Sequence, residues 1–209
     1  MKKINFKILI ITCIICLLPI VFGIIFYNDL TETVAVHFDI NNNPDGFMPK
    51  EFLVFGMPTV MVLIQMFACV VSDLKDENPE ANKRTMFMYK LIIPVMDVIV
   101  YVVTIMYAMG NMLDIRKIVM IILGIMFIVM GNYLPKTVGY NSINFPKIKN
   151  EKIYAKVKRV FGYIFIINGL LAIASTLFDV IVSVFVIILL VVEAIVLGIY
   201  SLVKNKKEN

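Results

Sequence analysis

Two carboxylates lie inside apolar runs, where a charged side chain needs a special environment. Asp97 falls near the middle of one run and Glu193 near the middle of another. A charged carboxylate at the centre of a bilayer costs about 2.5–3.5 kcal/mol on insertion scales, so each should be protonated, paired or in contact with water. One interpretation is a proton or cation site shared by both segments and supported by the amides of Gln65 and Asn168. The other is a pair of neutral carboxylic acids that make hydrogen bonds between helices.

A second group of polar residues lies in the acidic segment between the first two apolar runs, at 28–50. His37-Phe38-Asp39 and Asp45 are the candidates there for contact with a ligand, and a histidine can also respond to pH. The alternative is an ordinary surface histidine on a turn-rich segment. Oxygen-bearing side chains recur at alternate positions, as in a calcium loop, but the glutamate that completes such a loop is missing. No metal site is therefore predicted.

The three cysteines, Cys13, Cys16 and Cys69, lie inside apolar runs. Cys13 and Cys16 would share one helix face, but the βαβ context of a thioredoxin-like motif is missing, so we expect them to pack as small apolar residues. No nucleophile, base and orienting group recur together near one membrane face. We therefore expect neither an enzyme nor a cofactor.

The composition indicates a membrane environment for most of the chain. Hydrophobic residues make up 60% of the 209 residues, whereas soluble domains average about half. Because a helix needs about 20 apolar residues to cross a bilayer, the sequence predicts an all-α integral membrane protein, a six-transmembrane helix bundle in contact with the lipid bilayer. The predicted spans are 8–27, 51–71, 86–109, 118–134, 160–178 and 180–203.

Local signals predict the shape of one connection and the packing of two spans. The segment 34–39 alternates β-branched, aromatic and polar residues, and the turn signal Asn43-Pro44-Asp45-Gly46 follows it. This pattern predicts a short extended or hairpin-like extracellular loop after the first helix. In the second half, glycines recur at a seven-residue spacing that lets helices approach closely. They are Gly124, Gly131, Gly162 and Gly169.

The distribution of basic residues predicts the orientation. With six spans, all but Lys50, Arg116 and Lys117 of the 20 Lys and Arg residues fall on the side that holds both termini. Because positive residues favour the cytoplasmic side, both termini should be cytoplasmic, and the 28–50 loop should face outward. The basic residues lie beside spans and form no separate basic domain, so no direct nucleic-acid partner is expected.

The loop at 135–159 concentrates positive charge on the predicted cytoplasmic side. Its basic residues would attract anionic lipid by about 1 kcal/mol each. The pattern from Glu151 to Arg159 also suits a short amphipathic helix at the membrane interface. The side chains expected to face inward on that helix are Ile153, Tyr154, Val157 and Val160.

The ends of this loop carry residues at a recognisable spacing: Gly131, Asn132, Pro135 and Lys136, then Asn150, Glu151, Lys156, Arg159 and Gly162. This pattern resembles the SdpI family, membrane proteins named for immunity to a secreted, sporulation-delaying peptide toxin. Tyr154 stands in the place of the family's tryptophan and Lys158 in the place of its histidine. The loop core keeps Ile143 and Pro146 but lacks the family's arginine and tryptophan.

The first half resembles a domain that often precedes the SdpI region. The residues that carry this second resemblance are His37-Phe38-Asp39, Pro44-Asp45-Gly46 and Lys50. The two resemblances predict an N-terminal membrane domain at 1–109 and an SdpI-like membrane domain at 110–209.

The resemblance implies a non-enzymatic immunity protein of a bacterial cytoplasmic membrane that protects against a secreted peptide toxin. It also implies that the protein senses the toxin and binds a cytoplasmic transcriptional repressor. The implied toxin contacts are His37, Phe38, Asp39 and Asp45. The implied contacts with the cytoplasmic partner are Asn132, Pro135, Lys136, Pro146, Tyr154, Lys156 and Arg159. The alternative function is a proton- or ion-coupled transporter that uses Asp97 and Glu193.

Overall fold

The computed structural model describes residues 4–140, 148 and 150–207, apart from several side chains near the end of the last helix. The chain is 78% helical, and the described part contains six helices long and apolar enough to cross a membrane. Many large apolar side chains on these helices are exposed, including Phe67 and Phe185. The predicted class, an all-α membrane protein with six spans, is confirmed.

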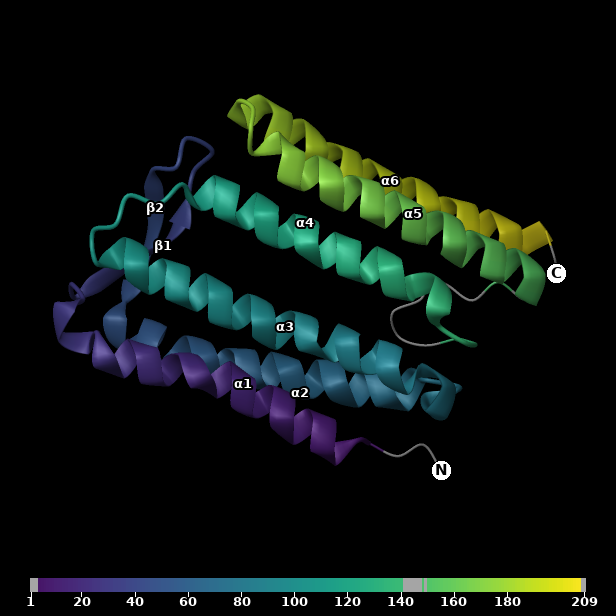
Figure 1. The fold of residues 1–209 in the computed structure, drawn as a ribbon, viewed down its shortest axis with the longest axis horizontal. Coiled ribbons are helices and arrows are strands. Elements are labelled where there is room, and N and C mark those ends of the chain that lie inside the picture. The colour runs from purple at the N-terminus through teal and green to yellow at the C-terminus, as the bar shows by residue number, and fades with distance from the viewer. Residues whose placement is uncertain (1–3, 141–147, 149, 208–209) are drawn as a thin grey trace. The chain divides into compact units, whose positions relative to one another are not determined.

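The helices and strands follow one another as α1 (Phe6–Ile25), β1 (Thr33–Phe38), β2 (Pro44–Pro49), α2 (Met57–Lys75), α3 (Pro79–Ala108), α4 (Ile115–Tyr133), α5 (Glu151–Ser175) and α6 (Val180–Lys207) (Figure 1). A π-helical turn, Phe52–Gly56, leads into α2, and short 3-10 turns lie at Tyr27–Asp29 and Leu134–Lys136. The chain forms two compact units: residues 1–74 with 87–118, and residues 75–86 with 119–209. The predicted domain division after residue 109 stays a prediction.

Helices α3 and α5 begin earlier than predicted. Helix α3 starts at Pro79, where proline suits the first turn because no intrahelical partner is needed for its missing N–H. Helix α5 starts at Glu151 because the Asn150 side chain accepts hydrogen bonds from the N–H groups of Lys152 and Ile153, both at 3.1 Å. The predicted interfacial helix is therefore wrong as a separate element, since it is the first part of a continuous helix.

The four side chains expected to face inward on that part of α5 differ in their burial within the protein. Tyr154 is buried, whereas Val160 is 46% exposed. Ile153 and Val157 are half-buried. The basic residue Lys158 is buried instead, one turn after Tyr154. The amine of Lys158 donates hydrogen bonds to the backbone oxygen and Oγ1 of Thr137. The pattern of apolar residues does not predict these contacts.

The first unit contains a hairpin that packs on its helices. Strands β1 and β2 pair antiparallel, with Val34 opposite Met48 and Ala35 opposite Phe47. Leu30 and Val34 join a buried cluster with Leu53, Val54, Tyr101 and Ile105, from the π-helical turn and α3. Burial of these side chains anchors one face of the hairpin, because each large apolar side chain removed from water contributes about 1.5–3 kcal/mol.

The hairpin turn lies earlier than the sequence predicts. Pro44, Asp45 and Gly46 belong to β2, and the chain reverses over residues 40–42. Asn42 adopts a left-handed conformation with φ 67°, which asparagine tolerates better than most residues. Gly46 is needed for strand packing rather than turning, because a Cβ there would lie 2.8 Å from the Cβ of His37.

The second unit packs α4 against α5 through glycines. A Cβ on Gly131 would lie 2.5 Å from the backbone oxygen of Gly162, and a Cβ on Gly124 would lie 2.6 Å from that of Gly169. The predicted close approach is confirmed: the paired glycines bring the two backbones together. Further along, Met120, Ala172 and Val186 form a small buried cluster between α4, α5 and α6.

Candidate functional site

The hairpin tip is organised by Asp39. Its Oδ1 accepts hydrogen bonds from the backbone N–H groups of Asn41 and Asn43, both at 2.8 Å. Its Oδ2 accepts one from the Asn43 side chain at 3.2 Å. Hydrogen bonds from the backbone and side chain of Asn43 hold the pKa of the Asp39 carboxyl below its usual value. Asp39 therefore shapes the turn, and its oxygens are occupied by the loop itself.

Asn42 joins the tip to the connection between α3 and α4. Its Nδ2 donates to the backbone oxygen of Leu113 at 2.9 Å, and its Oδ1 accepts from the N–H of Ile115 at 2.8 Å. Ile115 is the first residue of α4, so Asn42 satisfies an N–H that has no partner within the helix. These bonds put the hairpin and the α3–α4 connection at the same end of the unit, which is consistent with the predicted topology.

Two polar side chains of the hairpin form a solvent-exposed pair. The Nδ1 of His37 lies 2.5 Å from Oδ1 of Asp45, and the two side chains are 74% and 47% exposed. Phe38 turns away from this pair and packs edge-on against Tyr107 of α3, with ring centroids 4.7 Å apart. Of the four predicted toxin contacts, His37 and Asp45 are thus displayed, while Phe38 and Asp39 hold the hairpin in place.

Two exposed apolar side chains lie close to this pair in the chain. Ile40 in the turn and Phe47 on β2 are 63% and 60% exposed. The hairpin surface therefore combines carboxylates with isolated large apolar groups.

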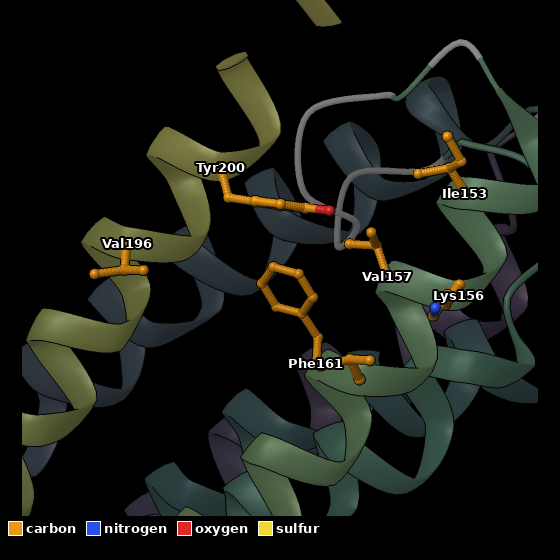
Figure 2. A pocket seen from close by; sticks show the side chains of 7 residues that line it. Ile153, Lys156, Val157, Phe161, Val196 and Tyr200 are labelled. Atoms are coloured by element: carbon orange, nitrogen blue, oxygen red, sulfur yellow. The ribbon is translucent and has the colours of Figure 1, made fainter. Parts of the chain in front are cut away.

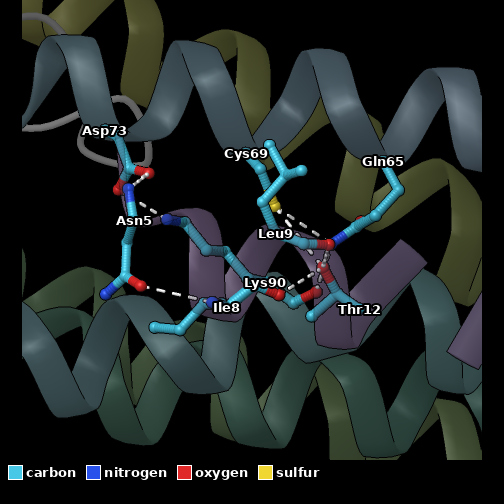
Figure 3. A network of polar contacts seen from close by, with 8 residues as sticks. All are labelled: Asn5, Ile8, Leu9, Thr12, Gln65, Cys69, Asp73 and Lys90. Carbon is cyan, nitrogen blue, oxygen red and sulfur yellow. Dashed lines mark hydrogen bonds and ion pairs between the residues drawn. The ribbon is translucent and has the colours of Figure 1, made fainter. Parts of the chain in front are cut away.

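A buried ion pair joins α2 to α3 (Figure 3). The Nζ of Lys90 lies 2.5 Å from Oδ1 of Asp73, and their side chains are 4% and 14% exposed. The second oxygen of Asp73 accepts from the backbone N–H of Asn5 at 2.9 Å, just before α1. The side chain of Asn5 in turn caps α1 by accepting from the N–H of Ile8 at 3.2 Å. One carboxylate therefore connects three helices.

Gln65 repairs a gap in the hydrogen bonding of α3. Pro94 lacks an N–H, so the carbonyl of Lys90, four residues earlier, has no helical donor. The Nε2 of Gln65 donates to that carbonyl at 2.9 Å and lies 3.2 Å from Sγ of Cys69 (Figure 3). Cys69 also lies 3.7 Å from Oγ1 of Thr12 on α1. The amide thus completes a helix that proline interrupts.

Replacing Gln65 with leucine is expected to destabilise the protein by about 1–3 kcal/mol, because the buried carbonyl of Lys90 loses its donor. The double variant Gln65→Leu/Pro94→Ala should recover much of this loss, since alanine restores a helical N–H. The measurement is unfolding of the purified protein in mixed micelles, followed by circular dichroism. Equal stability of the single and double variants would contradict this role for Gln65.

The two intramembrane carboxylates have different surroundings. Glu193 accepts a hydrogen bond from Nδ2 of Asn168, which joins α6 to α5. Asp97 is 7% exposed, and its Oδ2 has no hydrogen-bond partner among the described residues. The Oε1 of Gln65 is likewise without a partner in the described part of the chain. Asp97 belongs to the first unit and Glu193 to the second, so the shared site predicted from them stays a prediction.

The residues of the SdpI-like pattern largely hold the second unit together. Pro135 packs on Gly162, where a Cβ would meet its ring at 2.6 Å. Lys136 donates to Oδ1 of Asn132 at 3.1 Å and lies over the Tyr133 ring. Lys158 reaches the backbone oxygen of Thr137 at 2.5 Å. These contacts fix the 3-10 turn after α4 against the first part of α5.

The same turn is fixed from the other side by the start of α3. The side chain of Asn82 donates to Oδ1 of Asp76 at 2.7 Å and to the backbone oxygen of Val138 at 2.9 Å. Its own oxygen accepts from the N–H of Val138 at 2.8 Å. Glu77 and Tyr140 also exchange backbone and side-chain hydrogen bonds. These hydrogen bonds join the α2–α3 connection to the segment that follows α4.

The predicted partner contacts divide into structural and exposed residues. Tyr154 is buried beneath Lys158, whose Nζ lies 4.8 Å from the centre of its ring. Lys156 and Arg159 are exposed. Pro146 lies outside the described residues. Asn132, Pro135 and Lys136 are exposed as well, but they take part in the contacts around the 3-10 turn described above.

Several residues that shape these regions were missed by the sequence reasoning. They are Asn42, Asp73, Asp76, Asn82, Lys90 and Thr137. Lys90 carried a usable signal, because a lysine just inside an apolar run needs an acidic partner or a water-filled path. Asn42 carried none, since its partners lie more than 70 residues away.

A family model described as a domain of unknown function (DUF1648) matches residues 14–62. This domain is found in SdpI-like membrane proteins, and the match covers most of α1, the whole hairpin and the start of α2. It confirms the resemblance expected for the first half, while membership of the second half in the SdpI family stays a prediction. Comparisons with curated proteins and with solved structures found no match. The chain is thus a multi-pass membrane protein that contains a DUF1648 domain.

Proposed function

We propose that this protein is a non-enzymatic immunity protein of a bacterial cytoplasmic membrane that protects its cell from a secreted peptide toxin. The observation that carries the proposal is the anchored hairpin, which lies within the segment matched by the DUF1648 model and displays His37 and Asp45. The asymmetric distribution of Lys and Arg supports an outward-facing hairpin and cytoplasmic termini.

The chemistry of the hairpin favours a cationic peptide with apolar side chains. Residues 28–50 contain four carboxylates and one basic residue. That basic residue, Lys50, lies 3.3 Å from Glu32, so its charge is offset locally. Exposed Ile40 and Phe47 add apolar contact area. Opposite charge would steer such a peptide to the hairpin, and apolar contact would retain it.

Sensing is proposed to involve the basic start of α5. The resemblance implies capture of a cytoplasmic repressor, and Lys156 and Arg159 are exposed there. Binding of toxin and repressor would be coupled only if each prefers the same one of two conformations. The substitutions that separate sensing from protection are Lys156→Glu and Arg159→Glu.

Proton- or ion-coupled transport is the second candidate. It is supported by Asp97, whose Oδ2 is buried without a hydrogen-bond partner in the described residues. A carboxylate inside a membrane span is a functional candidate, because its charged form is energetically unfavourable there.

Substitution of the displayed pair should weaken protection while leaving the protein in the membrane. We expect His37→Ala/Asp45→Ala to lower survival of toxin-treated cells about tenfold or more, since loss of two interface contacts worth about 1 kcal/mol each changes affinity by more than tenfold. Survival is measured by colony counts at equal membrane levels of each variant.

The control for this assay is Asp29→Ala, which removes an exposed carboxylate from the same segment but outside the strands. Asp39→Asn is a second control, because its remaining oxygen can still accept the two backbone hydrogen bonds of the turn. Equal survival of the native and double-variant cells would contradict a toxin contact at the hairpin. Loss of protection in Asp97→Asn, with the hairpin intact, would favour transport.

A further inference from the structure

A groove of about 400 Å³ lies between α5 and α6 (Figure 2). Its volume falls within the range of about 300–1,000 Å³ that is usual for ligand sites. Val157 and Phe161 from α5 and Val196 and Tyr200 from α6 contribute to its apolar wall, and Lys156 supplies the one charge among its lining residues. Figure 2 shows the Tyr200 ring reaching from α6 toward α5, above Phe161.

The groove lies where a membrane boundary is expected. Tyr200 lies three residues before the end of the predicted span 180–203 in α6. On α5, the first three turns contain four basic residues and one acid, and Lys152, Lys156 and Arg159 are exposed. Tyrosine and basic residues are enriched at the level of lipid headgroups. The apolar wall continues from this level toward the middle of both helices.

We propose that this groove binds one anionic phospholipid. Its acyl chain lies against Val157, Phe161 and Val196, and its phosphate lies at Lys156. Charge complementarity favours a lipid over a second protein helix, because Lys156 is the one charged residue in an otherwise apolar lining and belongs to a basic stretch of α5. A lysine stem can follow apolar surface while its amine reaches the headgroup level. This inference does not depend on toxin immunity.

The absence of tryptophan from the chain allows a direct test. Tyr200→Trp puts a single fluorophore in the groove, and Phe185→Trp puts one on an exposed position elsewhere on α6. The full-length variants are placed in bilayers that mix phosphatidylcholine and phosphatidylglycerol with matched oleoyl chains. Either lipid is then brominated, so that quenching reports its occupancy beside the fluorophore.

Quenching of Tyr200→Trp should show an occupancy of phosphatidylglycerol about fivefold higher than that of phosphatidylcholine. This ratio corresponds to the attraction of about 1 kcal/mol between one lysine and anionic lipid. Adding Lys156→Gln should bring this ratio close to unity. The matched change Lys83→Gln, at an exposed lysine that does not line the groove, should leave it unchanged. Phe185→Trp should report a ratio near unity in every background.

Four results would overturn the proposal. The first is a ratio near unity at Tyr200→Trp, and the second is a ratio unaffected by Lys156→Gln. The third is an equal fall of this ratio with Lys83→Gln, which would mean that the general surface charge, and not Lys156, attracts phosphatidylglycerol. The fourth is quenching by neither lipid at Tyr200→Trp while Phe185→Trp is quenched, which would mean that protein covers the groove.

Discussion

Lys90→Met is expected to destabilise the protein by about 3–5 kcal/mol, because it leaves Asp73 without its cation in a largely buried site. The Lys90 amine and Asp73 carboxylate lie 2.5 Å apart and are mostly shielded from solvent. Asp73 also accepts the N–H of Asn5, so the unpaired charge would disturb the junction of α1, α2 and α3. Unfolding in mixed micelles, followed by circular dichroism, measures the loss.

A second substitution separates the charge from the packing. Asp73→Asn/Lys90→Met removes both charges and keeps an oxygen for the Asn5 N–H, so it should be more stable than Lys90→Met alone. Lys83→Met is the matched control, since Lys83 lies on the same helix but is exposed. If Lys90→Met and Lys83→Met unfold alike, the ion pair does not stabilise this junction.

Gly131→Leu should cost about 3 kcal/mol, the upper part of the usual range for overpacking. Even a Cβ at this position would lie 2.5 Å from the backbone oxygen of Gly162 and 2.9 Å from the backbone nitrogen of Ile166. Backbone atoms cannot move aside as a flexible side chain can, so α4 and α5 would have to separate. Thermal unfolding in detergent should show a lower midpoint.

Gly198→Leu is the control for this change. Gly198 lies in α6, and a Cβ there would meet nothing within 4 Å. Glycine is about 0.8–1 kcal/mol less favourable in a helix than alanine, and leucine ranks close to alanine, so this variant should be as stable as the native protein or slightly more stable. A Gly131→Leu protein as stable as Gly198→Leu would show that α4 and α5 do not depend on close approach.

The features that could be predicted from the sequence were those determined by residues near one another in the chain. Runs of apolar residues located all six spans, because each span needs its own hydrophobic length. The seven-residue glycine spacing indicated close helix approach, and the structure shows that α4 and α5 are the helices that meet there. Alternation at 34–39 indicated a strand, and β1 occupies Thr33–Phe38.

Failures arose where distant partners or caps decide the local structure. Pro44-Asp45-Gly46 is a strong turn signal, but hydrogen bonds to Asp39 and the left-handed Asn42 move the turn to residues 40–42. Charged residues after Glu151 suggested a separate interfacial helix. Asn150 instead caps one continuous helix, α5, because the charged residues do not interrupt it.

The candidate site was only partly predictable for the same reason. Sequence alone named His37 and Asp45 among four candidates in one short polar segment, but it did not show that these two side chains pair. It could not show that Asp39 is used by the turn or that Tyr154 lies beneath Lys158. Those roles depend on three-dimensional neighbours, so a motif residue can serve packing rather than binding.

Protection of living cells tests the central proposal most directly. The full-length protein is expressed in a toxin-sensitive bacterium, which is then exposed to the secreted peptides of the protein's own source organism. The proposal predicts higher survival than in cells with an empty vector, and a loss of that gain with His37→Ala/Asp45→Ala but not with Asp29→Ala. Equal killing of native-expressing and empty-vector cells, with the protein present in the membrane, would contradict it.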